Sequence, residues 1–139
     1  PGIMAATACA SLLGAPLADD FVVFSLGDVL TVRLRIEEWL GAAAKADFVI
    51  VLYNPRSKKR ISLLEMAWKI IMKHRSPETP VGIVKNAYRE GVEVKVISLN
   101  EAPSFKDINM VTTIIVGNQK TFVKNGYMVT PRGYDLDKQ

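Results

Sequence analysis

Apolar residues along the chain form two kinds of pattern, unbroken runs of strand length and longer stretches with helical spacing. The unbroken runs are rich in β-branched and aromatic residues, which is typical of strands buried by helices. They predict strands at 21–24, 48–53, 80–84 and 112–116. Apolar residues three and four positions apart predict helices over 31–45 and 61–75, and an alanine-rich stretch predicts a buried helix over 5–13.

Two shorter patterns in the second half of the chain indicate hairpins. Apolar and charged residues alternate over 92–96, and Glu90-Gly91 is a short connection from the preceding strand. Asn125-Gly126 predicts a tight turn within 122–129. Helices and strands thus alternate first and hairpins follow. We expect one domain, 1–139, of the α/β class, with a mixed, mostly parallel sheet flanked by helices.

Composition excludes several classes of protein. Cys9 is the only cysteine and His74 the only histidine, so an intrachain disulfide and a Cys/His zinc cluster are ruled out. The single cysteine favours a reducing compartment, so we expect a cytoplasmic location. No apolar run approaches the roughly 18 residues that span a bilayer, so we expect no membrane partner. A formal charge of +4 suits an anionic small molecule better than nucleic acid.

Common catalytic motifs are missing from the sequence. It contains no phosphate-binding P-loop, no dinucleotide fingerprint, no zinc-protease helix and no serine-hydrolase elbow. Cys9 lies among alanines and is interpreted as a core residue, and His74 as a solvated residue at a helix end. We therefore expect no metal site, and no residue is identified as a catalytic acid, base or nucleophile.

Ligands of open α/β sheets gather where strands end, and three strand ends carry small or amide residues. These are Tyr53-Asn54-Pro55, Lys85-Asn86-Ala87 and Gly117-Asn118, each of which is also compatible with an ordinary turn. A basic cluster follows the first of them and is either a solvated loop or a clamp for carboxylates. It comprises Arg56, Lys58, Lys59 and Arg60, which Arg89 and Arg132 could join.

Six collinear segments resemble one family. They are 1–6, 12–17, 52–57, 80–89, 112–118 and 128–134. Together they resemble the C-terminal half of a tetrapyrrole methyltransferase. Three motifs resemble the branch that methylates precorrin-3B at C17, namely Y-N-P-R-S at 53–57, N-A-Y-R-E-G at 86–91 and the closing segment 128–134. The resemblance implies the second domain of a two-domain, usually homodimeric enzyme, whose N-terminal domain this chain does not include.

The resemblance also implies a cofactor, S-adenosylmethionine, which leaves as S-adenosylhomocysteine. Its contacts would fall at Met4, Ala5, Tyr53, Asn54, Asn86 and Ala87. Small residues at Ala5 and Ala87 would let the cofactor approach the main chain, whereas Met4 replaces the Ser or Thr usual in the family. Methyl transfer is an in-line displacement governed by positioning, so it requires no protein nucleophile.

The implied substrate is an anionic tetrapyrrole, precorrin-3B or its cobalt form, methylated at C17 with ring contraction in cobalamin biosynthesis. Its carboxylates would pair with Arg56, Lys58, Arg60 and Arg89. With half of the cleft, the chain alone is expected to be inactive.

The alternatives to this enzyme are a non-catalytic ligand-binding or dimerisation module that retains the fold, and a basic nucleic-acid binder. Aromatic residues do not interleave with the lysines as a stacking surface requires, which disfavours the second.

Overall fold

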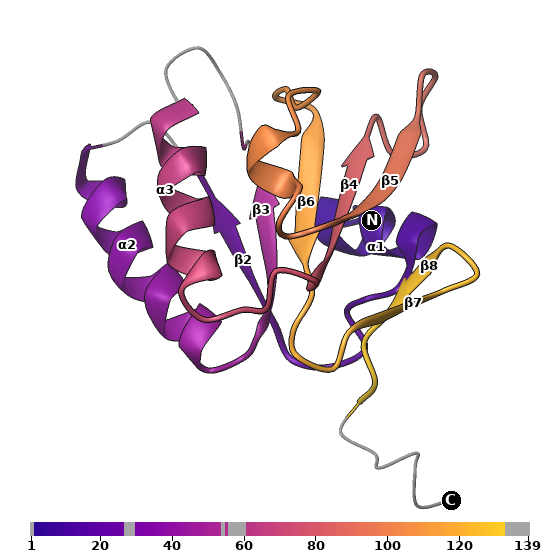
Figure 1. The fold of residues 1–139 in the computed structure, drawn as a ribbon. Coiled ribbons are helices and arrows are strands. Elements are labelled where there is room, and N and C mark those ends of the chain that lie inside the picture. Colours follow the sequence, from indigo (N-terminus) through magenta and orange to yellow (C-terminus); the bar gives the residue numbers. More distant parts are fainter. Residues whose placement is uncertain (1, 27–29, 54, 56–60, 133–139) are drawn as a thin grey trace, which may run out of the picture.

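In the part of the chain that the structure describes, the fold contains two sheets and three α-helices (Figure 1). The computed structural model describes residues 2–26, 30–53, 55 and 61–132. In chain order the elements are α1 (Ala5–Leu13), β1 (Gly14–Ala15), β2 (Phe21–Ser25), α2 (Leu30–Lys45), β3 (Val49–Tyr53), α3 (Ile61–Met72), β4 (Pro80–Lys85), β5 (Glu93–Ser98), the 3-10 helix η1 (Ala102–Ser104), β6 (Thr112–Val116), β7 (Phe122–Lys124) and β8 (Tyr127–Val129).

The larger sheet has five strands in the order β2-β3-β6-β4-β5. β2 and β3 pair in parallel, whereas β6 is antiparallel to both β3 and β4, and β5 is antiparallel to β4. The predicted α/β class and mixed sheet are confirmed. The pairing is less parallel than expected because β6 is inserted between β3 and β4. These two strands still run in one direction, so their carboxyl ends lie at the same edge of the sheet.

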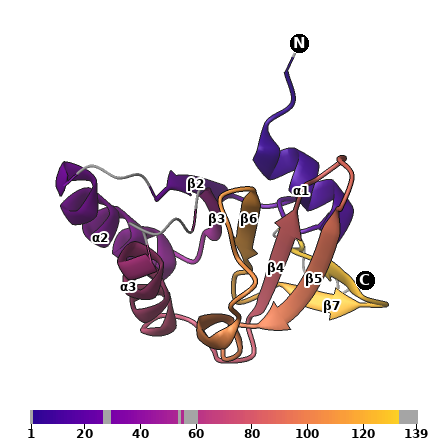
Figure 2. The ribbon, with the colours of Figure 1, turned by 90° about the horizontal axis from the view of Figure 1, so that it is seen from above.

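The five-stranded sheet separates two layers (Figure 2). Alternate side chains of β3 point to opposite faces. Ile50 and Leu52 belong to the core beneath α2 and α3, while Val49 and Val51 pack with α1. The three-stranded sheet β1-β8-β7 lies on the α1 side, where Met128 joins the same core. Two hydrophobic cores therefore lie on opposite faces of one sheet.

Most predicted elements are confirmed, with shifted ends. The helix over 5–13 and the strand over 112–116 have the predicted bounds. α3 ends at Met72, three residues early, because Arg75 turns into the interior. Asn125 and Gly126 both have positive φ, 53° and 79°, as a tight hairpin turn requires. The two-residue strand β1 was not predicted, since two residues carry no recognisable pattern.

Cys9 is 3% exposed and belongs to the core on the α1 side, as predicted. His74 is exposed just after α3, which agrees with its interpretation as a solvated residue. Within the described ranges, no helix combines the length and the apolar character that crossing a membrane demands.

Candidate functional site

A pocket of about 380 Å³ lies at the sheet edge where β3 and β4 end. Its walls come from the start of α1, the end of β3, the connection from β4 to β5, and the start of β6. Five of the residues predicted for cofactor or substrate line it: Ala5, Tyr53, Asn86, Ala87 and Arg89. The structure thus brings together residues that are up to 84 positions apart, from Ala5 to Arg89, in the chain.

Not every predicted site residue reaches this pocket. Met4 is exposed just before α1 and is not part of the lining, and Arg132 is exposed beyond β8. Asn54, Arg56, Lys58 and Arg60 lie outside the described residues, and so does Lys59.

The third strand end singled out in the sequence lies elsewhere. Gly117-Asn118 follows β6, which runs antiparallel to β3 and β4, so it lies at the opposite edge of the sheet. There the Asn118 side chain accepts hydrogen bonds from the backbone N–H groups of Lys120 and Thr121. The interpretation of this strand end as part of a common ligand site is wrong, and the turn interpretation holds.

Tyr53 connects the end of β3 to the start of α1. Its hydroxyl oxygen accepts a hydrogen bond of 2.5 Å from the backbone N–H of Ala6. First-turn N–H groups of a helix lack a partner within the helix, so this bond supplies one. Burial raises the pKa of Tyr53, and burial also raises the pKa of the neighbouring Cys9 thiol. Both side chains are therefore uncharged at neutral pH, and this wall of the pocket carries no negative charge.

The connection after β4 has an unusual backbone. Asn86 and Tyr88 have φ of 53° and 59°, a left-handed conformation that non-glycine residues seldom adopt. Hydrogen bonds hold it there, because the Arg89 N–H donates to the Asn86 carbonyl and the Tyr88 hydroxyl bonds with Ser11 of α1. Ala87 lies between the two left-handed residues with no large side chain, so the main chain borders the pocket closely. Such strained conformations are concentrated at functional sites.

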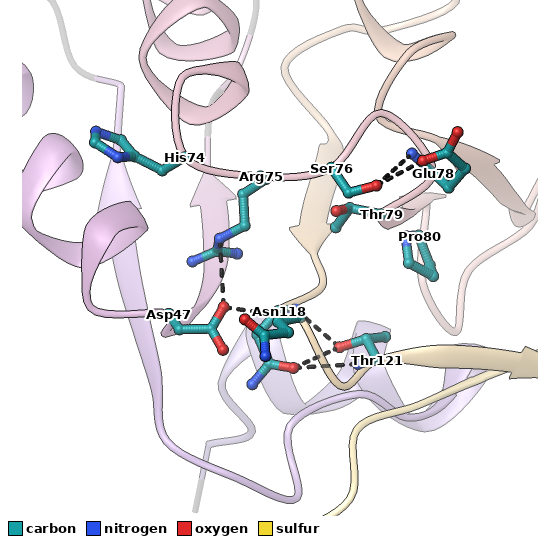
Figure 3. A pocket seen from close by; sticks show the side chains of 10 residues that line it. Asp47, His74, Arg75, Ser76, Glu78, Thr79, Pro80, Asn118 and Thr121 are labelled. Atoms are coloured by element: carbon teal, nitrogen blue, oxygen red, sulfur yellow. Dashed lines mark hydrogen bonds and ion pairs between the residues drawn. The ribbon is translucent and has the colours of Figure 1, made fainter.

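A second hollow, of about 290 Å³, lies at the opposite edge (Figure 3). Its main polar group is the buried guanidinium of Arg75, which donates to the carbonyl oxygens of Phe48 and Gly117 at 2.5 and 2.6 Å. Burial lowers the pKa of Arg75, while Asp47, 3.7 Å away, acts in the opposite direction. Because these groups satisfy one another, we interpret this hollow as a structural junction. The described residues also hold no group of three or more His, Cys, Asp or Glu placed to bind a metal.

Some lining residues of the first pocket were not predicted from the sequence. Ala8 and Cys9 lie three and four positions after Ala5, so the helical spacing places all three on one face of α1. That spacing could have identified them. Met110 and Val111 also line the pocket, and no local motif marks them. Thr112 and Thr113 line it too, and they begin the segment 112–118 that resembles the family, although neither was predicted as a site residue.

Comparison with known proteins agrees with this arrangement. The sequence profile of the tetrapyrrole (corrin/porphyrin) methylases matches residues 1–103. The chain belongs to the tetrapyrrole methylase family. It is 46% identical to a probable cobalt-factor III C(17)-methyltransferase of Salmonella typhimurium, over 98% of this chain and 56% of that protein. It is 48% identical to a cobalt-factor III methyltransferase of Priestia megaterium, over 96% of this chain and 25% of that protein.

A relative that is named for a precorrin substrate and a solved structure also match this chain. A precorrin-3B C(17)-methyltransferase of Sinorhizobium is 36% identical over 96% of this methylase chain and 54% of that protein. The crystal structure of the methyltransferase CobJ superposes with a TM-score of 0.87 and 32% identity, covering 94% of this chain and 54% of that one. The fold is that of a tetrapyrrole methylase domain, and the chain spans about half the length or less of these relatives.

Proposed function

We propose that this chain is the C-terminal domain of an S-adenosylmethionine-dependent methyltransferase. The substrate would be precorrin-3B or its cobalt form, methylated at C17 with ring contraction during cobalamin biosynthesis. The names of the relatives support the reaction. The observation that carries the assignment of the site is the pocket that gathers Ala5, Tyr53, Asn86 and Ala87.

The lining of the pocket fits the cofactor. Ala5 and Ala87 leave the main chain accessible, and the neutral Tyr53 hydroxyl can donate its proton to a ligand while its oxygen accepts from Ala6. An uncharged wall without a neighbouring carboxylate or thiolate suits a group that must react with the tetrapyrrole and not with the protein. When bound, S-adenosylmethionine supplies an electrophilic methyl group. The residues of this chain hold and orient it, which is what an in-line displacement requires.

Exposed apolar residues at the pocket support a two-domain arrangement. Ile3 is 83% exposed and Met110 57%, and both line the pocket beside the exposed Val111. Monomeric domains seldom leave several large apolar residues together in water. A preceding methylase domain would cover them and complete the cleft, in agreement with relatives of nearly twice this length. We further propose that the complete enzyme is a cytoplasmic homodimer.

Substrate recognition would depend on the basic residues near the pocket mouth. Arg89 is exposed and lines the pocket, so its guanidinium can pair with a carboxylate of the tetrapyrrole. The same role is proposed for Arg56, Lys58 and Arg60, which follow Tyr53 closely in the sequence. Asn54, the next residue after Tyr53, is proposed to contact the cofactor. Met4, which precedes Ala5, is proposed to contact the cofactor once the cleft is complete.

Titration with S-adenosylhomocysteine tests the proposal. Calorimetry would compare this chain with a version extended upstream into the first domain. We expect saturable binding by the extended version and much weaker binding by the chain alone. Absence of binding by both would contradict the cofactor assignment. Binding without methylation of precorrin-3B or its cobalt form would instead favour the non-catalytic ligand-binding module.

A further inference from the structure

Lys85, at the end of β4, is a buried cation held by two carboxylates. Its side chain is 11% exposed, and its Nζ lies 3.1 Å from Oε2 of Glu93 and also contacts Oδ1 of Asp107. The hydrogen bond to Asp107, followed by that to Glu93, raises the pKa of Lys85, so the ammonium stays charged over the physiological range. Lys85 directly precedes Asn86, which lines the candidate cofactor pocket.

The two carboxylates belong to different parts of the fold. Glu93 is the residue opposite Lys85 in the β4–β5 ladder. Asp107 lies in the segment 105–111, which joins η1 to β6 and has no strand pairing of its own. Met110 and Val111 of this segment line the pocket, and the Asn86 N–H donates to the Val111 carbonyl at 3.4 Å.

The two contacts therefore differ in what they hold in place. β5 is already fixed by six residue pairs with β4, so loss of the Glu93 contact leaves its position unchanged. At its start the segment 105–111 is anchored by Phe105, which packs against the core and lies under Lys95 of β5. Further along it is anchored by burial of Ile108, by the long Asn86–Val111 bond and by local bonds between Asn109 and Thr112. The Lys85–Asp107 contact adds an ionic link from this segment to the end of β4.

We propose that Lys85 is a positioning residue for the cofactor, which acts through Asp107 to hold segment 105–111 so that Met110 and Val111 form a wall of the pocket. This inference rests on the proposed function of the pocket. A wall that is less well placed weakens cofactor binding and leaves the positions of Ala5 and Tyr53 unchanged. The effect should therefore appear in the KM for S-adenosylmethionine and not in kcat.

The test compares Asp107→Asn with Glu93→Gln in the version extended upstream. The two substitutions are matched, since each removes one carboxylate charge from the same ammonium, and the two side chains are similarly exposed at 61% and 55%. Loss of an exposed ion pair changes an equilibrium constant by up to about fivefold. We expect Asp107→Asn to raise the Kd for S-adenosylhomocysteine by about fivefold and Glu93→Gln by less than about twofold. Lys85→Met should behave as Asp107→Asn does, and combining these two should add nothing.

A second measurement follows the segment directly. Hydrogen exchange at the amides of Asn109 and Val111, which are now hydrogen-bonded, should be faster in Asp107→Asn than in Glu93→Gln at equal melting temperature. Equal affinities and equal exchange rates in the two variants would overturn the inference. If the unsubstituted extended protein binds no S-adenosylhomocysteine, the proposed function itself fails. If it binds and the variants do not differ, only the role of Lys85 fails.

Discussion

A Cβ atom added to Gly82 would stand 2.4 Å from Cδ1 of Leu13. Gly82 lies on β4, facing α1, and Leu13 is the last residue of that helix and is fully buried. The missing side chain on β4 thus allows α1 to lie close to the sheet. Since α1 carries Ala5, Ala8 and Cys9, this contact also sets one wall of the pocket.

Gly82→Ala should therefore destabilise the protein by about 1–3 kcal/mol, the usual effect of overpacking a core. The free energy of unfolding in urea measures it. Gly41→Ala is the matched control, because a Cβ there would meet Ile70 at an ordinary 3.9 Å within α2. The control should be stabilised by about 0.5–1 kcal/mol, since alanine favours a helix over glycine. Equal effects at the two glycines would contradict the role of Gly82.

Tyr53→Phe should lower stability by about 1–3 kcal/mol, because the Ala6 N–H would lose its acceptor. The same variant should bind S-adenosylhomocysteine more weakly, since the pocket loses a donor and the start of α1 loses its attachment to β3. Chemical denaturation and calorimetry measure the two effects. If the stability is unchanged, the bond between Tyr53 and Ala6 does not support α1.

The stability difference between the native protein and Tyr53→Phe should also depend on pH. Burial raises the pKa of Tyr53 above its ordinary value of 10.0. Above pH 10 the unfolded chain loses this proton while the folded chain retains it, so stability attributable to Tyr53 falls as pH rises toward the folded pKa. Below pH 10 the difference should be constant. A difference that stays constant from pH 9 to pH 11 would contradict the burial of this phenol.

Ala87→Leu in the version extended upstream should abolish binding of S-adenosylhomocysteine and leave the fold intact, because the larger side chain would occupy the space of the ligand. Ala42→Leu is the control, an exposed position on α2 at the other face of the sheet. Calorimetry and melting temperatures compare them. Undiminished affinity in Ala87→Leu would count against the site.

Arg75→Met should destabilise the fold by about 2–4 kcal/mol, since it removes the donor to the Phe48 and Gly117 carbonyl oxygens from a buried site. Lys73→Met, an exposed change nearby, should have little effect. Cofactor affinity measured below the melting temperature should not change, because Arg75 lies at the opposite edge of the sheet. A loss of affinity would mean that the second hollow has a functional role.

The sequence predicts the strands well because their patterns report burial directly, as the unbroken run ending at Tyr53 illustrates. It also identifies Tyr53, Asn86 and Ala87 as residues at strand ends, and the common direction of β3 and β4 brings them together. The sequence groups Asn118 with the other two strand ends, and this is wrong for a physical reason. The apolar pattern of β6 does not encode whether the strand pairs in a parallel or an antiparallel direction. Arg75 was missed because, beside Lys73 and His74, it resembles an ordinary charged helix end. Its burial depends on carbonyl groups contributed by distant segments.

Because the two cores lie on opposite faces of the sheet, stability and ligand binding of the methylase domain can be altered in different layers. Among the described residues the two cores form separate clusters, although Phe105 and Ile108 connect the layer of α2 and α3 to the segment that lines the pocket. Substitutions in that layer that do not contact these two residues should have energetic effects that add to those made on the pocket side. A laboratory could raise the heat tolerance of this domain from one layer and retune its ligand preference from the other, provided that the segment shared by both is left unchanged.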